Sequence, residues 1–193
     1  MVLSLMFLCA ALLTGIDQIT KWLARTYLAG RQPFVLIDGV FELRYIENTG
    51  AAFGILSGYK ILLIIITTIA LIGLIIIFAR GVLGKSKIVI VSCTLILAGG
   101  MGNLIDRVFR DGVIDFFYFK LIDFAIFNVA DSFVVVGALL MLFYFLFNQK
   151  ELNLHAKNAK KQSEISSQVN GESDAVNGDK DTDPFAGNDG RKT

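Results

Sequence analysis

Four long apolar blocks constrain the fold of this chain more than any other feature of its sequence. Each block is close to the ~20 residues that a helix needs to cross the hydrocarbon core of a bilayer. The predicted spans cover about residues 2–22, 60–79, 88–107 and 127–147. The chain is 54% hydrophobic, which is typical of an integral membrane protein. We therefore predict an all-α polytopic membrane domain with four transmembrane helices over residues 1–150.

The two ends of the chain differ in composition. From Glu151 onward, Asn, Lys, Ser, Asp and Gly replace the large apolar residues, so residues 151–193 are predicted to be a disordered polar tail. The first apolar block has no basic segment before it and no small-x-small cleavage pattern after it. It is therefore predicted to be a retained helix and not a cleaved signal peptide.

Basic residues in the short loops predict the orientation. The connection between the second and third blocks carries Arg80, Lys85 and Lys87, and more lysines follow the fourth block. Because short cytoplasmic loops are enriched in Lys and Arg, both regions are predicted to be cytoplasmic. Four alternating spans then place both termini, and the tail, in the cytoplasm.

The charge balance and the cysteines exclude several functional classes. The chain has eighteen Lys and Arg residues and seventeen Asp and Glu residues. This near-neutral balance does not favour a nucleic-acid partner. Cys9 and Cys93 both lie in apolar runs, a pattern that predicts buried free thiols. It predicts neither a disulfide framework nor a metal site.

Two outer segments connect the spans. Residues 30–58 alternate apolar and polar side chains around Asp38-Gly39, a pattern that predicts a short β-hairpin. Residues 109–123 are rich in Phe and Tyr with a few charges, which is typical of an interfacial stretch at headgroup depth.

Apart from the basic residues of the cytoplasmic connection and the residues that follow the fourth block, the charged and amide residues in or beside the spans fall on the outer side of the predicted topology. They include Asp17, Lys21, Asn48, Asn103, Asp106, Arg107, Asp115, Asn128 and Asp131. A charged side chain near the centre of a helical span costs about 2.5–3.5 kcal/mol on insertion scales, and less near its edge. The retention of several such residues on one side predicts a functional site there.

Some of these residues also have simple structural explanations. Asp17 and Lys21 are four residues apart and can form an ordinary helix ion pair. Arg107 can snorkel or pair with a carboxylate, and the neighbouring Asp106 is the natural partner. The glycines of "GGMG", residues 99–102, allow close helix packing.

Asp115 and Asp131 lie on separate elements that the fold can bring together. A close acid pair in a poorly solvated site shares a proton, so one acid can act as general base on a water and the other as general acid toward a leaving amine. Asn128 lies three residues before Asp131 and can orient it. Asp123 is a rival for one place, but "LIDFAIF" offers it no polar companion. From the residues alone, a metal-independent hydrolase and a small proton or ion transporter both remain open.

Five motifs, in this order, resemble the lipoprotein signal peptidases (signal peptidase II) of bacterial inner membranes. They are "DQITK", "ENTGAAFG", "GGMGNLIDR", "GVIDFF" and "FNVADS", and the resemblance covers residues 17–147. It implies an intramembrane aspartic endopeptidase that removes the signal peptide of a prolipoprotein just before the cysteine that carries a diacylglyceryl group. The catalytic aspartates of the family fall on Asp115 in "VIDF" and Asp131 in "FNVAD".

The resemblance has further implications for the site. The supporting positions of the family fall on Asp17, Lys21, Asn48, Gly54, Asn103, Asp106, Arg107, Asn128 and Ala130. No cofactor or metal is implied, and a β-like cradle is expected over the site on the outer face of the membrane. The peptide-like antibiotic globomycin is the implied inhibitor. We expect a monomer surrounded by membrane lipids, because one chain holds every required part. Which acid carries the shared proton stays open.

Overall fold

The computed structural model describes residues 2–51 and 55–148. Among these residues, four helices are long and apolar enough to cross a membrane. They are α1 (Val2–Leu28), α2 (Lys60–Ala79), α3 (Lys87–Phe109) and α4 (Val129–Phe147). The prediction of a four-span membrane protein is therefore confirmed. Gly54 and the predicted tail lie outside the described residues.

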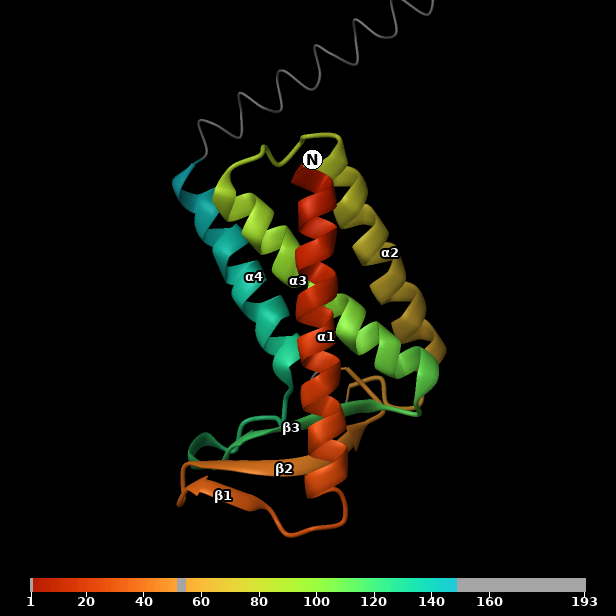
Figure 1. Cartoon of the computed structure of the whole chain (residues 1–193), viewed down its shortest axis with the longest axis vertical. Helices are drawn as coiled ribbons and strands as arrows, with labels where there is room; N and C mark the ends of the chain where they lie inside the picture. The colour runs from red at the N-terminus through yellow and green to blue at the C-terminus, as the bar shows by residue number, and fades with distance from the viewer. Residues whose placement is uncertain (1, 52–54, 149–193) are drawn as a thin grey trace, which may run out of the picture.

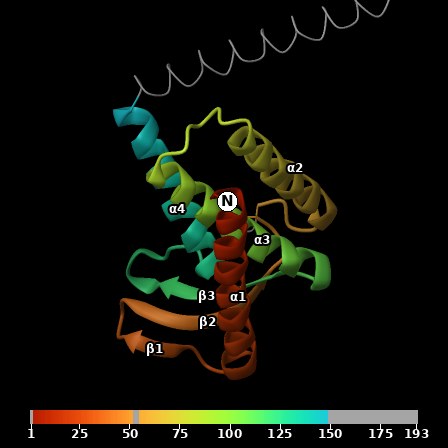
Figure 2. The same cartoon turned by 45° about the horizontal axis from the view of Figure 1, so that its top comes forward.

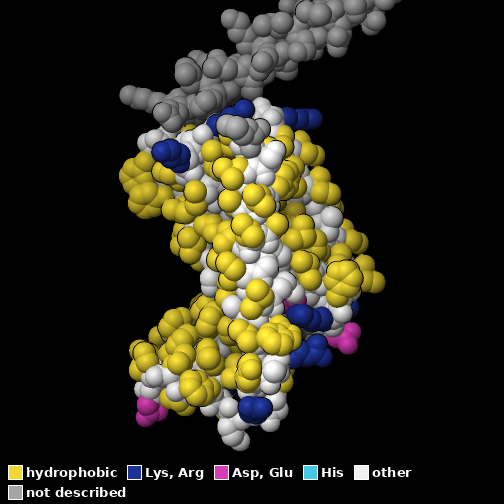
Figure 3. Space-filling view, viewed as in Figure 1, with side chains coloured by type: hydrophobic (Ala, Val, Ile, Leu, Met, Phe, Trp, Pro, Cys, Tyr) yellow, Lys and Arg dark blue, Asp and Glu magenta, His cyan; other side chains and the backbone are white. Residues whose placement is uncertain are grey.

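The central helix of the bundle is α3, which packs against α1, α2 and α4 (Figure 1). Its buried apolar side chains form one cluster with those of the other helices, including Met6, Leu71, Cys93 and Met141. Hydrophobic side chains also cover most of the visible outer surface of the bundle (Figure 3). An apolar exterior of this kind suits contact with lipid.

Glycines allow the helix backbones to approach closely, as predicted for "GGMG". A Cβ at Gly99 would lie 2.2 Å from the carbonyl oxygen of Ala130 at the start of α4. A Cβ at Gly102 would lie 2.4 Å from Oδ2 of Asp17 in α1. Since neither position has room for a side chain, Gly99 allows the backbone of α4 to approach α3, and Gly102 leaves space for the Asp17 carboxylate.

A small antiparallel sheet lies at the end of the bundle opposite the N-terminus (Figures 1 and 2). Its strands β1 (Phe34–Ile37), β2 (Phe41–Asn48) and β3 (Val113–Phe119) are arranged in that order. The β1–β2 pair is the predicted hairpin, and Gly39 adopts the left-handed conformation (φ +69°) in its turn.

The aromatic segment forms a strand, which we did not predict. Val113–Phe119 pairs with β2 along most of its length, and a short 3-10 helix, η2 (Lys120–Ile122), follows it. The first four residues of β3 are buried whichever way they point. Because both faces are covered, the strand lacks the alternation of apolar and polar residues that usually reveals one.

The predicted span limits agree with the structure for α2, α3 and α4 to within two residues. The first helix is longer than predicted and continues from Trp22 to Leu28. Its last turns lie against the sheet, where Ala24 packs with Ile114 and Phe116. Packing beyond the apolar block therefore extends α1, and Asp17 lies well inside the helix.

Candidate active site

Asp115 and Asp131 line one cavity of about 750 Å³, which we call the catalytic cavity because it holds the two acids predicted to be catalytic. Asp115 comes from β3 and Asp131 from the first turn of α4. Most of the other lining side chains are apolar and come from α2, α3, α4 and the segment before α4, including Ile66, Ile96 and Phe127. The fold thus brings the two predicted acids into one largely apolar cavity.

Asn128 holds both acids. Its Nδ2 donates to Oδ1 of Asp115 at 2.6 Å. Its Oδ1 accepts the backbone N–H of Asp131, and its own backbone N–H donates to Oδ2 of Asp131 at 3.1 Å. This reciprocal pair is a capping box that begins α4. The prediction that Asn128 orients Asp131 is confirmed.

Asn103 provides a second link between the same groups. Its Nδ2 donates to Oδ1 of Asp131 at 2.7 Å. Its Oδ1 accepts from Asn128 Nδ2 at 3.1 Å and from Lys21 Nζ at 2.9 Å. With both donors on its oxygen, the amide must aim its nitrogen at Asp131.

Asn48, at the end of β2, holds the other acid. Its Nδ2 donates to Oδ2 of Asp115 at 3.0 Å and to the carbonyl oxygen of Ala51 at 3.2 Å. Its Oδ1 accepts the backbone N–H of Gly50 at 2.9 Å. Both carboxylate oxygens of Asp115 are therefore bonded to asparagine side chains, and Asn48 also fixes the loop that follows β2.

A buried ion cluster lies behind the acids. Lys21 Nζ is 2.9 Å from Oδ2 of Asp17 and 2.9 Å from Oδ2 of Asp106, and all three residues are 0% exposed. Arg110 binds the other oxygen of Asp106 at 2.7 Å. Asp17 Oδ1 accepts the backbone N–H of Ala130 at 2.9 Å. The predicted Asp17–Lys21 pair is confirmed, and it connects α1 with α3 and α4.

The predicted pairing of Arg107 with Asp106 is wrong. Arg107 donates to the carbonyl oxygens of Gly50 at 3.2 Å and Asn103 at 3.5 Å, while Asp106 binds Lys21 and Arg110. Adjacent residues on a helix do not face each other, whereas residues four apart do. Arg107 lines the catalytic cavity.

Asp123 was predicted to lack a polar companion, and this is also wrong. The hydroxyl of Tyr118 donates to Oδ1 of Asp123 at 2.6 Å. Asp123 is exposed and is absent from the lining of the catalytic cavity, whereas Asp115 is 2% exposed and lies within it. The structure thus separates Asp123 from the acid pair.

Two members of the network were not singled out from the sequence. Gln18 Nε2 donates to Gly102 O at 3.1 Å and to side-chain oxygens of Asp17 and Asp106 at 3.2 Å. Arg110 was included only in the outer segment of residues 109–123. Its position four residues after Asp106 was the signal that could have identified it.

Burial and the nearby charge of Asp131 raise the pKa of Asp115 to about 7. The hydrogen bonds from Asn48 and Asn128 favour the charged form and oppose this shift. Near neutral pH, Asp115 therefore holds a proton for much of the time. A buried acid with a proton to give, beside a second carboxyl, can perform general acid–base chemistry.

Comparison with known proteins identifies the family. The family model described as signal peptidase (SPase) II matches residues 9–147. The lipoprotein signal peptidase of Caldanaerobacter subterraneus subsp. tengcongensis is 40% identical over 137 residues, covering 71% of this chain and 92% of the relative. That of Bacillus subtilis is 36% identical over 146 residues, covering 75% and 94%.

A solved structure supports the same conclusion. A bacterial membrane enzyme determined by the in meso method at 2.3 Å resolution superposes with a TM-score of 0.69 at 33% identity. The match covers 77% of this chain and 91% of that one. On the matched family model, the identity to curated relatives and the shared fold, this chain belongs to the signal peptidase II family.

Proposed function

We propose that this chain is an intramembrane aspartic endopeptidase that removes the signal peptide from diacylglyceryl-modified prolipoproteins, cutting just before the lipidated cysteine. Membership of the signal peptidase II family supports the substrate class. The observation that carries the mechanism is the placement of Asp115 and Asp131 in one largely apolar cavity, joined by Asn128.

The two acids have different roles because their surroundings differ. Asp131 lies in the first turn of α4, where the helix dipole and N–H donors stabilise a negative charge. Asp115 carries the shared proton. The carboxylate of Asp131 removes a proton from water as the water oxygen attacks the scissile carbonyl carbon. Asp115 then gives its proton to the leaving nitrogen as the C–N bond breaks, and the proton on Asp131 returns to Asp115.

The supporting residues position these acids without reacting. Asn48, Asn103 and Asn128 donate hydrogen bonds to the acid pair. The cluster of Asp17, Lys21 and Asp106 holds Asn103 and the first turn of α4, including the Ala130 amide. Arg107 anchors the loop after β2 next to the catalytic cavity through the carbonyl of Gly50.

We place the chain in the bacterial inner membrane with both termini in the cytoplasm and the acids facing the outer side. The N-terminus and the basic α2–α3 connection lie at one end of the bundle, and the sheet lies at the other (Figure 1). A lipidated cysteine lies at the outer leaflet, so its peptide bond reaches the level of the acids. The enzyme acts as a monomer among membrane lipids, and globomycin-type inhibitors occupy the catalytic cavity.

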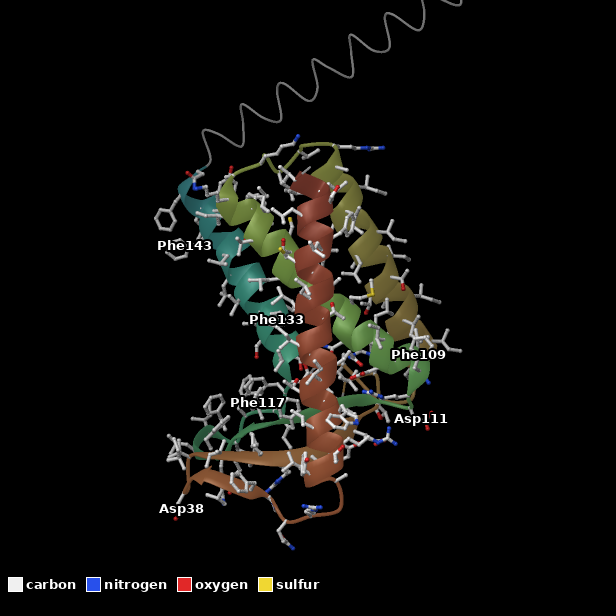
Figure 4. All side chains as sticks on the ribbon, viewed as in Figure 1. Asp38, Phe109, Asp111, Phe117, Phe133 and Phe143 are labelled. Atoms are coloured by element: carbon white, nitrogen blue, oxygen red, sulfur yellow. The ribbon has the colours of Figure 1, made fainter. Side chains whose placement is uncertain are left out.

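Cleavage of a diacylglyceryl-modified prolipoprotein by the purified chain in detergent, with EDTA present, tests this proposal. Wild type should cleave, whereas Asp115→Asn and Asp131→Asn should be inactive although folded. Asp111→Asn is the matched control, because its side chain is fully exposed and points away from the bundle (Figure 4). Cleavage by Asp131→Asn, or loss of wild-type cleavage in EDTA, would contradict the mechanism. If the chain were instead a small proton or ion transporter, neither wild type nor any variant would cleave the substrate.

A further inference from the structure

A second cavity of about 500 Å³ opens in the sheet layer, and we call it the outer cavity. Charged and hydroxyl side chains make up a larger share of its lining than of the lining of the catalytic cavity. In the outer cavity they are Arg44, Glu47, Thr49, Ser57, Tyr118 and Asp123. The mechanism above uses none of these side chains.

The two cavities are adjacent and share part of their lining. Asn48, Phe124, Ala125 and Ile126 line both of them. Asn48 also donates to Asp115, so the junction lies within one hydrogen bond of the catalytic pair. A chain that passes from the catalytic cavity into the outer cavity would therefore present a peptide bond near the acids.

We propose that the outer cavity binds the first residues of the mature lipoprotein, directly after the lipidated cysteine, and favours basic over acidic side chains there. The inference rests on the proposed function and adds a substrate preference to it. A signal peptide is apolar before the scissile bond, and the mature chain after it is polar and leads away from the membrane. The catalytic and outer cavities show the same change from apolar to polar lining.

The charges of the outer cavity favour a basic chain. Arg44 is its one lining cation among the described residues, and the guanidinium already lies 3.7 Å from Glu42 and 4.7 Å from the centre of the Tyr118 ring. Glu47 and Asp123 have no ion-pair partner in the part of the chain that the structure describes. Two carboxylates therefore remain to attract a bound cation.

Neutral hydroxyls hold these two carboxylates in place. Tyr45 donates to Glu47 at 2.5 Å, and Tyr118 donates to Asp123 at 2.6 Å. These hydrogen bonds fix the orientation of both acids. Their remaining acceptor positions are available to a lysine or arginine of the substrate.

Arg44 also offers a contact for the substrate backbone. Its Nε is buried and has no hydrogen-bond partner among the described residues. The substrate would instead meet the rest of the side chain, which is 43% exposed and lines the outer cavity, so its terminal nitrogens can donate to a peptide carbonyl. The outer cavity thus provides a donor for the peptide backbone and two acceptors for its side chains.

Two prolipoproteins that differ only after the cysteine, with Lys-Lys or Glu-Glu, test the proposal in a neutral detergent. Wild type should show a kcat/KM about five- to tenfold higher for the basic substrate, since each exposed charge pair contributes modestly. Raising the ionic strength should reduce this ratio. The double variant Glu47→Gln/Asp123→Asn should bring it close to one, and Asp111→Asn should keep the wild-type ratio.

The ratio of the two kcat/KM values compares two substrates on one enzyme. A partial loss of folded protein lowers both values equally and leaves the ratio unchanged. Should the double variant not fold, Asp123→Asn alone suits the left-handed backbone at that position (φ +47°) and should lower the ratio in part. Equal cleavage of both substrates by wild type would overturn the inference, and so would a ratio unchanged in these variants. Failure of wild type to cleave either substrate would instead overturn the proposed function, and this inference with it.

Discussion

Replacing Gly99 by alanine should displace Asp131 without removing any catalytic group. The added Cβ would lie 2.2 Å from the carbonyl oxygen of Ala130 and 2.7 Å from Cγ2 of Val134, where ordinary contact begins at 3.4 Å. The clash with Ala130 involves backbone, so rotation of a side chain cannot relieve it. The first turn of α4 must therefore move by about 1 Å, as expected when a close-packed interior is overfilled.

A shift of this size is large for the site. Asn103 Nδ2 is 2.7 Å from Oδ1 of Asp131, and a displacement of about 1 Å lengthens this contact beyond hydrogen-bonding distance. A misplacement of about 1 Å can lower catalysis by about 100-fold, and overpacking typically costs about 1–3 kcal/mol of stability. We expect Gly99→Ala to be folded, less stable, and about 100-fold lower in kcat/KM.

Prolipoprotein cleavage and thermal unfolding in detergent measure the two effects. Gly73→Ala is the matched control, since its Cβ would meet nothing within 4 Å. It should retain activity, and its free energy of unfolding should rise by about 0.5–1 kcal/mol. Gly100→Ala should be milder than Gly99→Ala, because it contacts only the flexible end of Leu71. Equal activity of Gly99→Ala and Gly73→Ala would refute the reasoning.

Three further predictions follow from the same contacts. Lys21→Met leaves Asp17 and Asp106 buried without their shared cation, so it should lower the free energy of unfolding by about 3–5 kcal/mol. A thermal unfolding curve like that of wild type would contradict this. Because the pKa of Asp115 is raised to about 7, kcat/KM should decline as pH rises above about 7, and the unfolding free energy should fall between about pH 4 and 7. Asp115→Asn should remove that slope in pH-dependent unfolding, and its persistence would assign the slope to another group. Asn128→Ser keeps a good N-cap but loses the donor to Asp115, so kcat should fall while the unfolding temperature stays close to that of wild type. A fall in kcat accompanied by an equally clear fall in the unfolding temperature would show that Asn128 acts through the helix alone.

The spans were predictable because the bilayer fixes both the length and the hydrophobicity of a transmembrane helix. The end of α1 was not, since Ala24 is buried by the sheet and not by lipid. The strand β3 was missed because tertiary contacts cover both of its faces and remove the sequence signal of a strand.

The types of residue at the site were predictable, but their pairings were less so. One-sided placement of the polar residues predicted which residues gather, and helical spacing predicted the contacts of Asp17 with Lys21 and of Asn128 with Asp131. Partners on different helices depend on interhelical geometry that one sequence does not contain. Asp106 illustrates this limit, because its cation Lys21 lies on α1.

The network explains why asparagines, and not cations, contact the two acids. A cation beside a carboxyl typically lowers its pKa by about 1–3 units, which would remove the proton that Asp115 donates in the proposed mechanism. Here the buried cation Lys21 is held by Asp17 and Asp106 and contacts Asp131 through the neutral amide of Asn103. Its charge lowers the pKa of Asp115 less than burial and Asp131 raise it. The cluster therefore supplies rigidity to the acid pair, while its charge is balanced by acids that take no part in the reaction. Neutral donors leave the proton of Asp115 free to move, as general acid catalysis requires.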